Sequence, residues 1–171
     1  MFRLFLKKSK LTVFLLHQIF QKKEDANWNI LEINPRLAIT VADFKKFIET
    51  NLQKGLQFIS DEDLVNNSMP SGKYALITFD DGYYNNHLAL PILQEYKIPA
   101  IFFVSTKNIL ENKSFWWDVV WRERNKRGVQ VSKIITERQM LKTKKSKEIE
   151  NYLISEFGID ALFPKSDIDR P

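Results

Sequence analysis

The sequence contains no cysteine among its 171 residues. It therefore forms no disulfide and offers neither a thiolate metal ligand nor a cysteine nucleophile. Histidine is almost as scarce, because only His17 and His87 are present. Any metal site that this chain builds with imidazoles has at most these two.

Long hydrophobic runs are also absent, and none approaches the ~20 apolar residues of a membrane-spanning helix. The basic residues 1–10 and the apolar residues 11–16 superficially resemble an export signal. A polar stretch without a small-residue cleavage site follows, so we instead expect a first strand that is buried on both faces of a parallel sheet. The location is then cytoplasmic or unknown. The net charge of +5 is too modest to identify an anionic partner, and we expect no nucleic-acid ligand.

The first part of the chain alternates between helix and strand patterns. Residues 40–54 predict a helix that Thr40 caps and Gly55 ends. Residues 73–79 and 99–104 predict buried strands, with a helix over much of residues 84–96. A strand, a helix and a second strand in this order form a βαβ unit. The pattern predicts an α/β fold with a parallel sheet and helices outside.

The character of the sequence changes further on, and we divide the chain into residues 1–112 and 113–171. Residues 114–121 are rich in aromatic side chains, which either pack in a core or stack on sugar rings. Residues 136–157 predict one long basic helix that Thr136 caps and Gly158 ends. The basic run at residues 121–150 suits a solvated helix face, and binding to an anionic glycan or nucleic acid is the alternative.

Asp80 and Asp81 directly follow the predicted strand at residues 73–79. In parallel α/β sheets, reactive groups gather where strands end and loops begin. Successive side chains diverge, so one carboxylate can face a metal ion and the other a proton, while Gly82 allows a sharp turn. One aspartate alone does not hold a transition metal, and histidines normally complete such a site.

Three blocks make this turn more specific than an ordinary Asp-Asp-Gly: residues 76–83 (LITFDDGY), 90–93 (LPIL) and 98–104 (IPAIFFV). Together they resemble the polysaccharide deacetylase family (NodB homology, carbohydrate esterase family 4). The resemblance implies an incomplete (β/α) barrel with an added basic helical segment. It also implies hydrolysis of N- or O-acetyl groups on a carbohydrate substrate, with a divalent metal, usually zinc.

The same resemblance assigns the site residues. It implies that Asp80 is the general base and Asp81 a metal ligand, and it assigns no residue to an organic cofactor. His17 matches a histidine that ends the first strand in relatives, so it is a candidate neighbour of the active site. The alternative is a partly buried histidine without catalytic duty. His87 is expected to point into solvent from the following helix.

The chain departs from the family pattern in one important respect. No His-x-x-x-His follows Asp81, so two of the three expected metal ligands are absent. We therefore expect a truncated protein that is inactive alone. Its expected partners are a second copy of itself, through self-association, or a missing C-terminal portion. Two other hypotheses stay open: a non-catalytic glycan-binding descendant, and an α/β phosphotransfer-type domain that uses Asp80 and Asp81 for magnesium.

Overall fold

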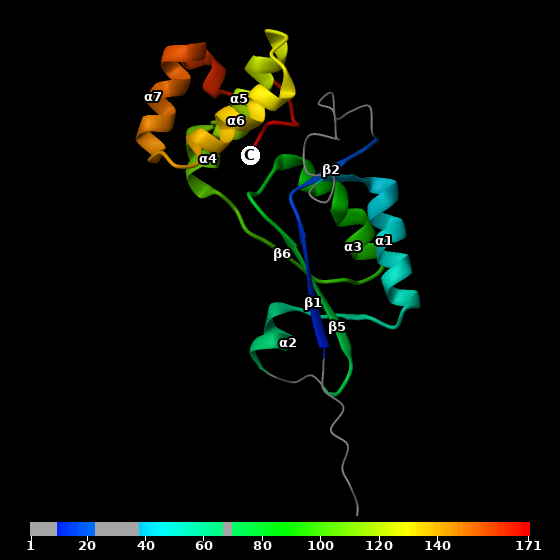
Figure 1. Ribbon diagram of the computed structural model, residues 1–171. Helices are drawn as coiled ribbons and strands as arrows, with labels where there is room; N and C mark the ends of the chain where they lie inside the picture. Colours follow the sequence, from blue (N-terminus) through cyan, green and yellow to red (C-terminus); the bar gives the residue numbers. More distant parts are fainter. Residues whose placement is uncertain (1–9, 23–37, 67–69) are drawn as a thin grey trace, which may run out of the picture. The chain divides into compact units, whose positions relative to one another are not determined.

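The computed structural model describes residues 10–22, 38–66 and 70–171 of the chain (Figure 1). Residues 1–9 of the segment that resembles an export signal lie outside this described part. The chain forms two compact units, Met1–Val104 and Ser105–Pro171. The sequence-based domain division between residues 112 and 113 stays a prediction. No helix in the described part is both long and apolar enough to cross a membrane.

The first unit alternates between strands and helices along the chain. Its elements are β1 (Lys10–Leu16), β2 (Gln18–Phe20), β3 (Ala38–Thr40), α1 (Val41–Gln53), β4 (Gln57–Phe58), α2 (Asp61–Val65), β5 (Lys73–Phe79), the 3₁₀ helix η2 (Tyr84–Ala89), α3 (Leu90–Glu95) and β6 (Ala100–Phe102).

β5 lies in the middle of a parallel sheet. β1 pairs with β5 along its full length, from Lys10 opposite Lys73 to Leu16 opposite Phe79. The other edge of β5 pairs with β4 near its start and with β6 near its end, and both pairs are also parallel. β2 and β3 form a separate parallel pair. The predicted parallel α/β arrangement is therefore confirmed, and the described strands do not close into a barrel.

Helices α1 and α3 cover one face of this sheet (Figure 1). Thr40 caps α1 as predicted, since its hydroxyl accepts a hydrogen bond from the Asp43 amide at 3.1 Å. The fully buried side chains of Phe44 and Ile48 project from α1 onto Ile77 of β5 and its neighbours. Burying aromatic and branched side chains in this way contributes roughly 1.5–3 kcal/mol per residue. This packing holds the carboxyl ends of β1 and β5 in place.

The opposite face of β1 corrects one expectation. Residues 11–16 do form a strand, but the strand is not buried on both sides. Leu11, Val13 and Leu15 alternate along it and are 37%, 54% and 44% exposed. No described element covers them, because α1 and α3 both pack on the other face of the sheet. The strand thus presents an apolar stripe to solvent.

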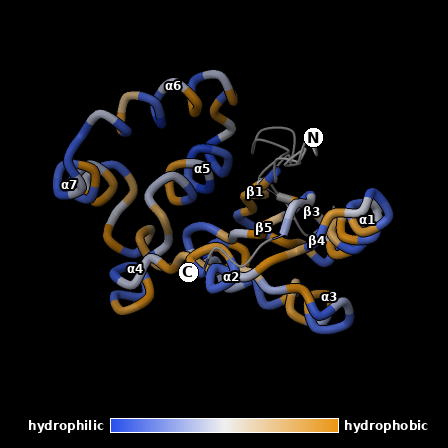
Figure 2. Tube along the Cα trace, turned by 90° about the horizontal axis from the view of Figure 1, so that it is seen from below, coloured by the Kyte–Doolittle hydropathy of each residue, from blue (hydrophilic) through white to orange (hydrophobic). Residues whose placement is uncertain are grey.

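The second unit is helical. Its elements are α4 (Thr106–Glu111), α5 (Trp116–Lys126), α6 (Val131–Leu141), α7 (Ser146–Phe157) and the 3₁₀ helix η3 (Ile159–Leu162). α5 contacts both α6 and α7, and Val119 and Val120 of α5 are fully buried. The trace of α7 alternates between hydrophobic and hydrophilic segments, as expected for a helix with one buried face (Figure 2).

The single long helix predicted over residues 136–157 is wrong. The structure has two helices, α6 and α7, separated at Lys142–Lys145. Thr136 is not a cap but lies within α6, where its hydroxyl donates to the Ser132 carbonyl at 3.0 Å. The break lets two apolar faces, including Ile134 and Leu153, both reach the core of this unit. A straight helix would present only one continuous stripe. Gly158 ends α7 as predicted, with a positive φ of 84°.

Part of the basic segment is tied into this helical packing. Arg124 of α5 binds Glu137 of α6 through two nitrogens at 2.8 and 3.1 Å, and Glu156 of α7 at 2.8 Å. Its guanidinium also lies 4.8 Å from the ring centre of Phe157. These contacts raise the pKa of Arg124, chiefly through the hydrogen bonds to Glu137. Arg124 therefore connects three helices, whereas Lys142, Lys144 and Lys145 of the segment are exposed.

Candidate functional site around Asp81

The Asp80–Asp81–Gly82 turn begins where β5 ends. The Asp80 amide donates to the Leu16 carbonyl at 2.8 Å, so the turn is joined to the end of β1. Asp81 then takes a left-handed backbone conformation with φ of 72°, which Asp tolerates better than most residues. This conformation turns the chain sharply at the edge of the sheet where parallel α/β proteins carry their reactive groups.

Gly82 follows with φ of 81° and packs against β6's continuation at Val104. A Cβ atom at position 82 would lie 3.0 Å from the Cα atom of Val104 and 3.1 Å from its Cγ1. The first of these is a backbone atom that cannot rotate away. Glycine is therefore required here both for the conformation and for the close approach of two chain segments.

The structure brings His17 and Asp81 together. His17 lies between β1 and β2, and its Nε2 atom is 3.7 Å from Asp81 Oδ2. The two side chains come from segments that are far apart in the sequence but end at the same edge of the sheet. Each is 26% exposed, so solvent or a ligand reaches both. Asp80 is also partly exposed at this turn.

The electrostatics of the turn centre on Asp81. Burial raises the pKa of Asp81 above its ordinary value, and the imidazole of His17 opposes this effect. The neighbouring Asp80 carboxylate raises the pKa of Asp81 further, since two adjacent negative charges repel. A cation near Asp81 would stabilise the charged form of the carboxylate, which both burial and repulsion from Asp80 disfavour.

His17 and Asp81 are also placed to share one ion. Two ligands of a tetrahedral zinc ion, each about 2.1 Å from the metal, lie about 3.4 Å apart. The separation of 3.7 Å is close to that value. The Nδ1 atom of His17 is buried without a hydrogen-bond partner, so nothing in the described part fixes the tautomer of the ring.

These two donors do not complete a metal site. Among the described residues, no three His, Asp or Glu side chains gather closely enough to hold a metal ion. The other histidine, His87, is exposed as expected, and its Nδ1 lies 2.7 Å from the Tyr84 carbonyl oxygen. The residues present thus offer a pair of ligands, and a full zinc site needs at least three from protein.

Two asparagines beside the turn were not singled out from the sequence. Asn85 and Asn86 lie on η2, which packs against β2, and they are only 6% and 4% exposed. Neither side-chain amide has a hydrogen-bond partner among the residues that the structure describes. Leaving such a buried group unpaired costs roughly 1–3 kcal/mol. Two adjacent asparagines shortly after an Asp-Asp-Gly turn were the available signal, but in sequence they read as ordinary turn residues.

The fold and the turn together define a class: an α/β protein with paired carboxylates at the carboxyl edge of a parallel sheet. The model of the polysaccharide deacetylase family matches residues 67–155, which is more than half of the chain. The chain therefore belongs to the polysaccharide deacetylase family. The matched residues include the turn and extend into the helical unit.

Two solved structures are similar to the chain. One is the Streptococcus pyogenes deacetylase PplD in complex with acetate, 28% identical, with a TM-score of 0.46 over 60% of this chain and 45% of that one. The other is BC0361, a polysaccharide deacetylase from Bacillus cereus, 23% identical, with a TM-score of 0.47 over 58% of this chain and 31% of that one. The chain thus spans less than half of either protein. No curated protein matches it.

Proposed function

We propose that this chain supplies part of the site of a metal-dependent carbohydrate deacetylase. The observation that carries the proposal is the pairing of His17 with Asp81 at a turn that lies within the residues matched by the family. Asp80 would act as the general base and Asp81 as one metal ligand, with His17 beside it. The substrate would be a sugar that carries an N- or O-acetyl group.

The reaction that these residues would serve is hydrolysis. As a water molecule attacks the acetyl carbonyl carbon, Asp80 would accept its proton. The bond from the acyl carbon to the sugar nitrogen or oxygen would then break as that atom takes up a proton, which the protonated Asp80 would return. The products are acetate and a free amine or hydroxyl. In such enzymes a bound divalent metal polarises the carbonyl and acidifies the water. The described residues do not complete the ligand set of such a metal.

The shortage of ligands has a consequence for activity. The sequence has no third histidine, so further imidazoles would have to come from another polypeptide segment. We propose that the chain alone binds a divalent metal weakly and turns over little or no substrate. The parallel sheet would then be part of an incomplete barrel, and the apolar stripe of β1 would be the face that further strands or a second copy cover.

Calorimetric titration of the full chain with zinc tests this proposal. We expect weak binding that is lost in Asp81→Ala and reduced at least tenfold in His17→Ala. Asp61→Ala is the matched control, since Asp61 is an exposed aspartate at the start of α2 in the same unit. Binding that survives in Asp81→Ala would sink the metal assignment. Magnesium-dependent acyl-phosphate labelling of Asp80 or Asp81 would instead support the phosphotransfer alternative.

Non-catalytic glycan binding is the second candidate function, and the incomplete ligand set favours it. Acetate release from an acetylated chitooligosaccharide separates the two. Any release that depends on added zinc and disappears in Asp80→Asn supports a catalytic role. Sugar binding without release, and without a change in Asp80→Asn, supports the non-catalytic alternative.

A further inference from the structure

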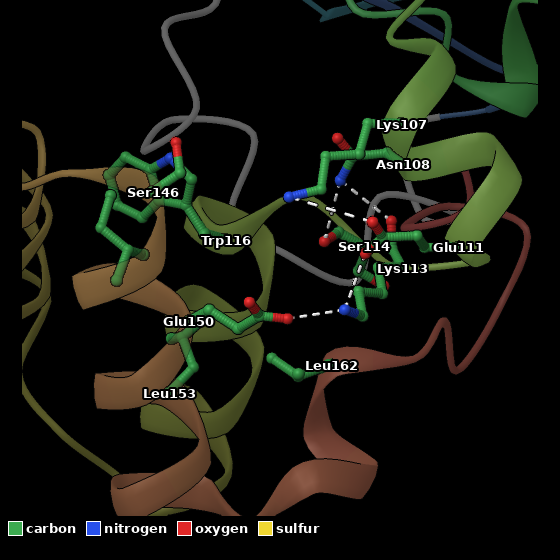
Figure 3. A pocket seen from close by; sticks show the side chains of 11 residues that line it. Lys107, Asn108, Glu111, Lys113, Ser114, Trp116, Ser146, Glu150, Leu153 and Leu162 are labelled. Carbon is green, nitrogen blue, oxygen red and sulfur yellow. Dashed lines mark hydrogen bonds and ion pairs between the residues drawn. The ribbon is translucent and has the colours of Figure 1, made fainter.

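A small pocket lies within the helical unit, away from the residues of the Asp80–Asp81 turn in sequence. It is formed by α4, the loop that follows it, the start of α5, the first turns of α7, and η3 (Figure 3). Its volume is about 180 Å³. Pockets that enclose drug-sized molecules measure ~300–1,000 Å³, so this one suits a ligand about as large as a single ring.

One part of the pocket lining is apolar. Trp116 contributes an indole ring that is only partly buried, and Ile149, Leu153 and Leu162 line the pocket with it. Trp117 does not line the pocket but stacks on Phe115, with ring centres 4.8 Å apart. Within the aromatic cluster, Trp116 therefore lines the pocket, whereas Phe115 and Trp117 pack against each other. An indole face packs well against an apolar ring surface.

The polar lining carries charges that cancel. Lys113 Nζ lies 2.7 Å from Glu111 Oε2 and 2.6 Å from Glu150 Oε1, so one ammonium joins two carboxylates (Figure 3). Lys107 Nζ lies 3.9 Å from the other oxygen of Glu111. Among the side chains that line the pocket, two lysines therefore balance two glutamates, while Lys147, which does not line it, lies 3.7 Å from Glu150 Oε2. A pocket with no net charge favours neither a phosphate nor a free metal ion, and it suits a neutral ligand.

Hydrogen bonds hold this polar wall in position. The Asn108 side chain donates to the carbonyls of Lys113 and Ser114 at 3.1 and 3.4 Å, and it accepts from the Ser105 hydroxyl at 3.0 Å. The loop that carries Lys113 is thereby fixed to α4. A carboxylate has about four acceptor positions, so Glu111 and Glu150 retain some after binding the lysines. These acceptors can take hydrogen bonds from hydroxyl groups without rearrangement of the wall.

We propose that this pocket binds one neutral pyranose unit of a glycan. The apolar face of the sugar ring would lie on Trp116, and its hydroxyls would donate to Glu111 and Glu150. This arrangement matches an amphipathic ring whose edge carries only hydroxyl or amide groups. The proposal does not depend on the Asp80–Asp81 turn, because every residue in it belongs to the helical unit. It assigns a sugar-binding role to a part of the chain that the proposed chemistry does not use.

NMR of the full chain provides a direct test, because each of the four tryptophans gives its own indole N–H signal. The Trp116 signal is assigned from its loss in Trp116→Phe. Titration with chitotriose should shift this signal saturably, with a dissociation constant on the order of 1 mM, the weak end of specific binding. Sodium sulfate at the same concentrations should leave the signal unchanged.

Ser146→Phe is the variant designed to fill the pocket. Ser146 lines it at the start of α7, and the larger side chain should weaken binding at least tenfold. Ser155→Phe is the matched control, since Ser155 is an exposed serine of the same helix that does not line the pocket. Glu150→Gln keeps the shape of the side chain and should weaken binding several-fold. It keeps the test decisive if Ser146→Phe fails to fold.

Three results would overturn the proposal. The first is that the Trp116 signal does not shift at a sugar concentration 20-fold above the expected dissociation constant. The second is that the shift is the same in Ser146→Phe and Ser155→Phe as in the unaltered chain. The third is that sulfate, and not the sugar, shifts the signal. The same titration of Asp81→Ala distinguishes this pocket from the turn. Unchanged sugar binding in that variant supports a separate site, whereas lost binding assigns the sugar to the turn and removes the pocket from consideration.

Discussion

Gly82 and Gly55 are two glycines of the first unit that share a backbone conformation and differ in their surroundings. Their φ angles are 81° and 75°, both in the left-handed region. A Cβ atom on Gly55 would meet nothing within 4 Å, whereas one on Gly82 would lie 3.0 Å from the Cα atom of Val104. Replacing each glycine by alanine therefore separates the cost of the backbone conformation from the cost of the close contact.

The expected magnitudes follow from these two terms. Gly55→Ala carries only the left-handed penalty, roughly 1–2 kcal/mol. Gly82→Ala carries the same penalty and also crowds the backbone at Val104, and overpacking of this kind costs roughly 1–3 kcal/mol. The total for Gly82→Ala is then about 2–5 kcal/mol. The loss of unfolding free energy should be at least about 1 kcal/mol larger for Gly82→Ala than for Gly55→Ala. The contact is with the backbone of Val104, so it is relieved only if the segment that follows β6 moves.

Hydrogen exchange of the β5 amides in urea is the assay, since β5 lies in the middle of the first unit and reports its opening. The free energy of opening should fall further in Gly82→Ala than in Gly55→Ala. Equal losses would refute the reasoning, because they would mean that the contact with Val104 relaxes without cost. The zinc titration of Gly82→Ala adds a functional reading, and we expect weaker binding through displacement of Asp81.

Three further predictions concern stability and association. Asp169→Ala should destabilise the helical unit by roughly 3 kcal/mol, because Asp169 is 1% exposed and its loss breaks a buried ion pair with Arg122. Stability should also fall as the pH drops below the ordinary glutamate range, since the hydrogen bond from Arg124 lowers the pKa of Glu156. A lowered folded-state pKa stabilises above the unfolded-state pKa and loses that stabilisation as pH falls through the folded-state pKa. Finally, Val13→Lys should weaken self-association at least tenfold, since Val13 is 54% exposed on the apolar stripe of β1.

Each of these has its own control. Asp167→Ala, at an exposed aspartate near Asp169, should change the unfolding free energy by less than about 0.5 kcal/mol. Glu156→Gln should flatten the acid side of the pH profile, and an unchanged profile would contradict the role of Glu156. Analytical ultracentrifugation measures association, with Val65→Lys as the control on another exposed valine of the same unit. If Val13→Lys and Val65→Lys associate alike, the stripe of β1 is not the interface.

Local patterns predicted most elements of the first unit. Residues 73–79 form a strand with the predicted limits, and the cap at Thr40 and the end at Gly55 are both present. These features depend on neighbouring residues, whose side chains and backbone preferences are legible in order along the chain. The helix predicted over residues 84–96 divides into η2 and α3 at Leu90, just before Pro91.

The prediction of one helix over residues 136–157 was wrong because the break depends on contacts between distant segments. The helical pattern of apolar residues continues on both sides of Lys142–Lys145, and this stretch contains no proline or glycine that would end a helix. The break follows from the need to place two apolar faces in the core beside α5. Such a need arises only when distant segments meet, so a local pattern does not contain it.

The candidate site divides in the same way. The sequence by itself determined the Asp80–Asp81–Gly82 turn at the end of a strand, the shortage of histidines and the resemblance to a deacetylase, because each is a property of residue order. Only the tertiary structure decided that His17 faces Asp81, that Val104 closes on Gly82, and that Trp116 lines a pocket with Glu150. These contacts join segments far apart in the chain, and parallel pairing and helix packing alone bring them together.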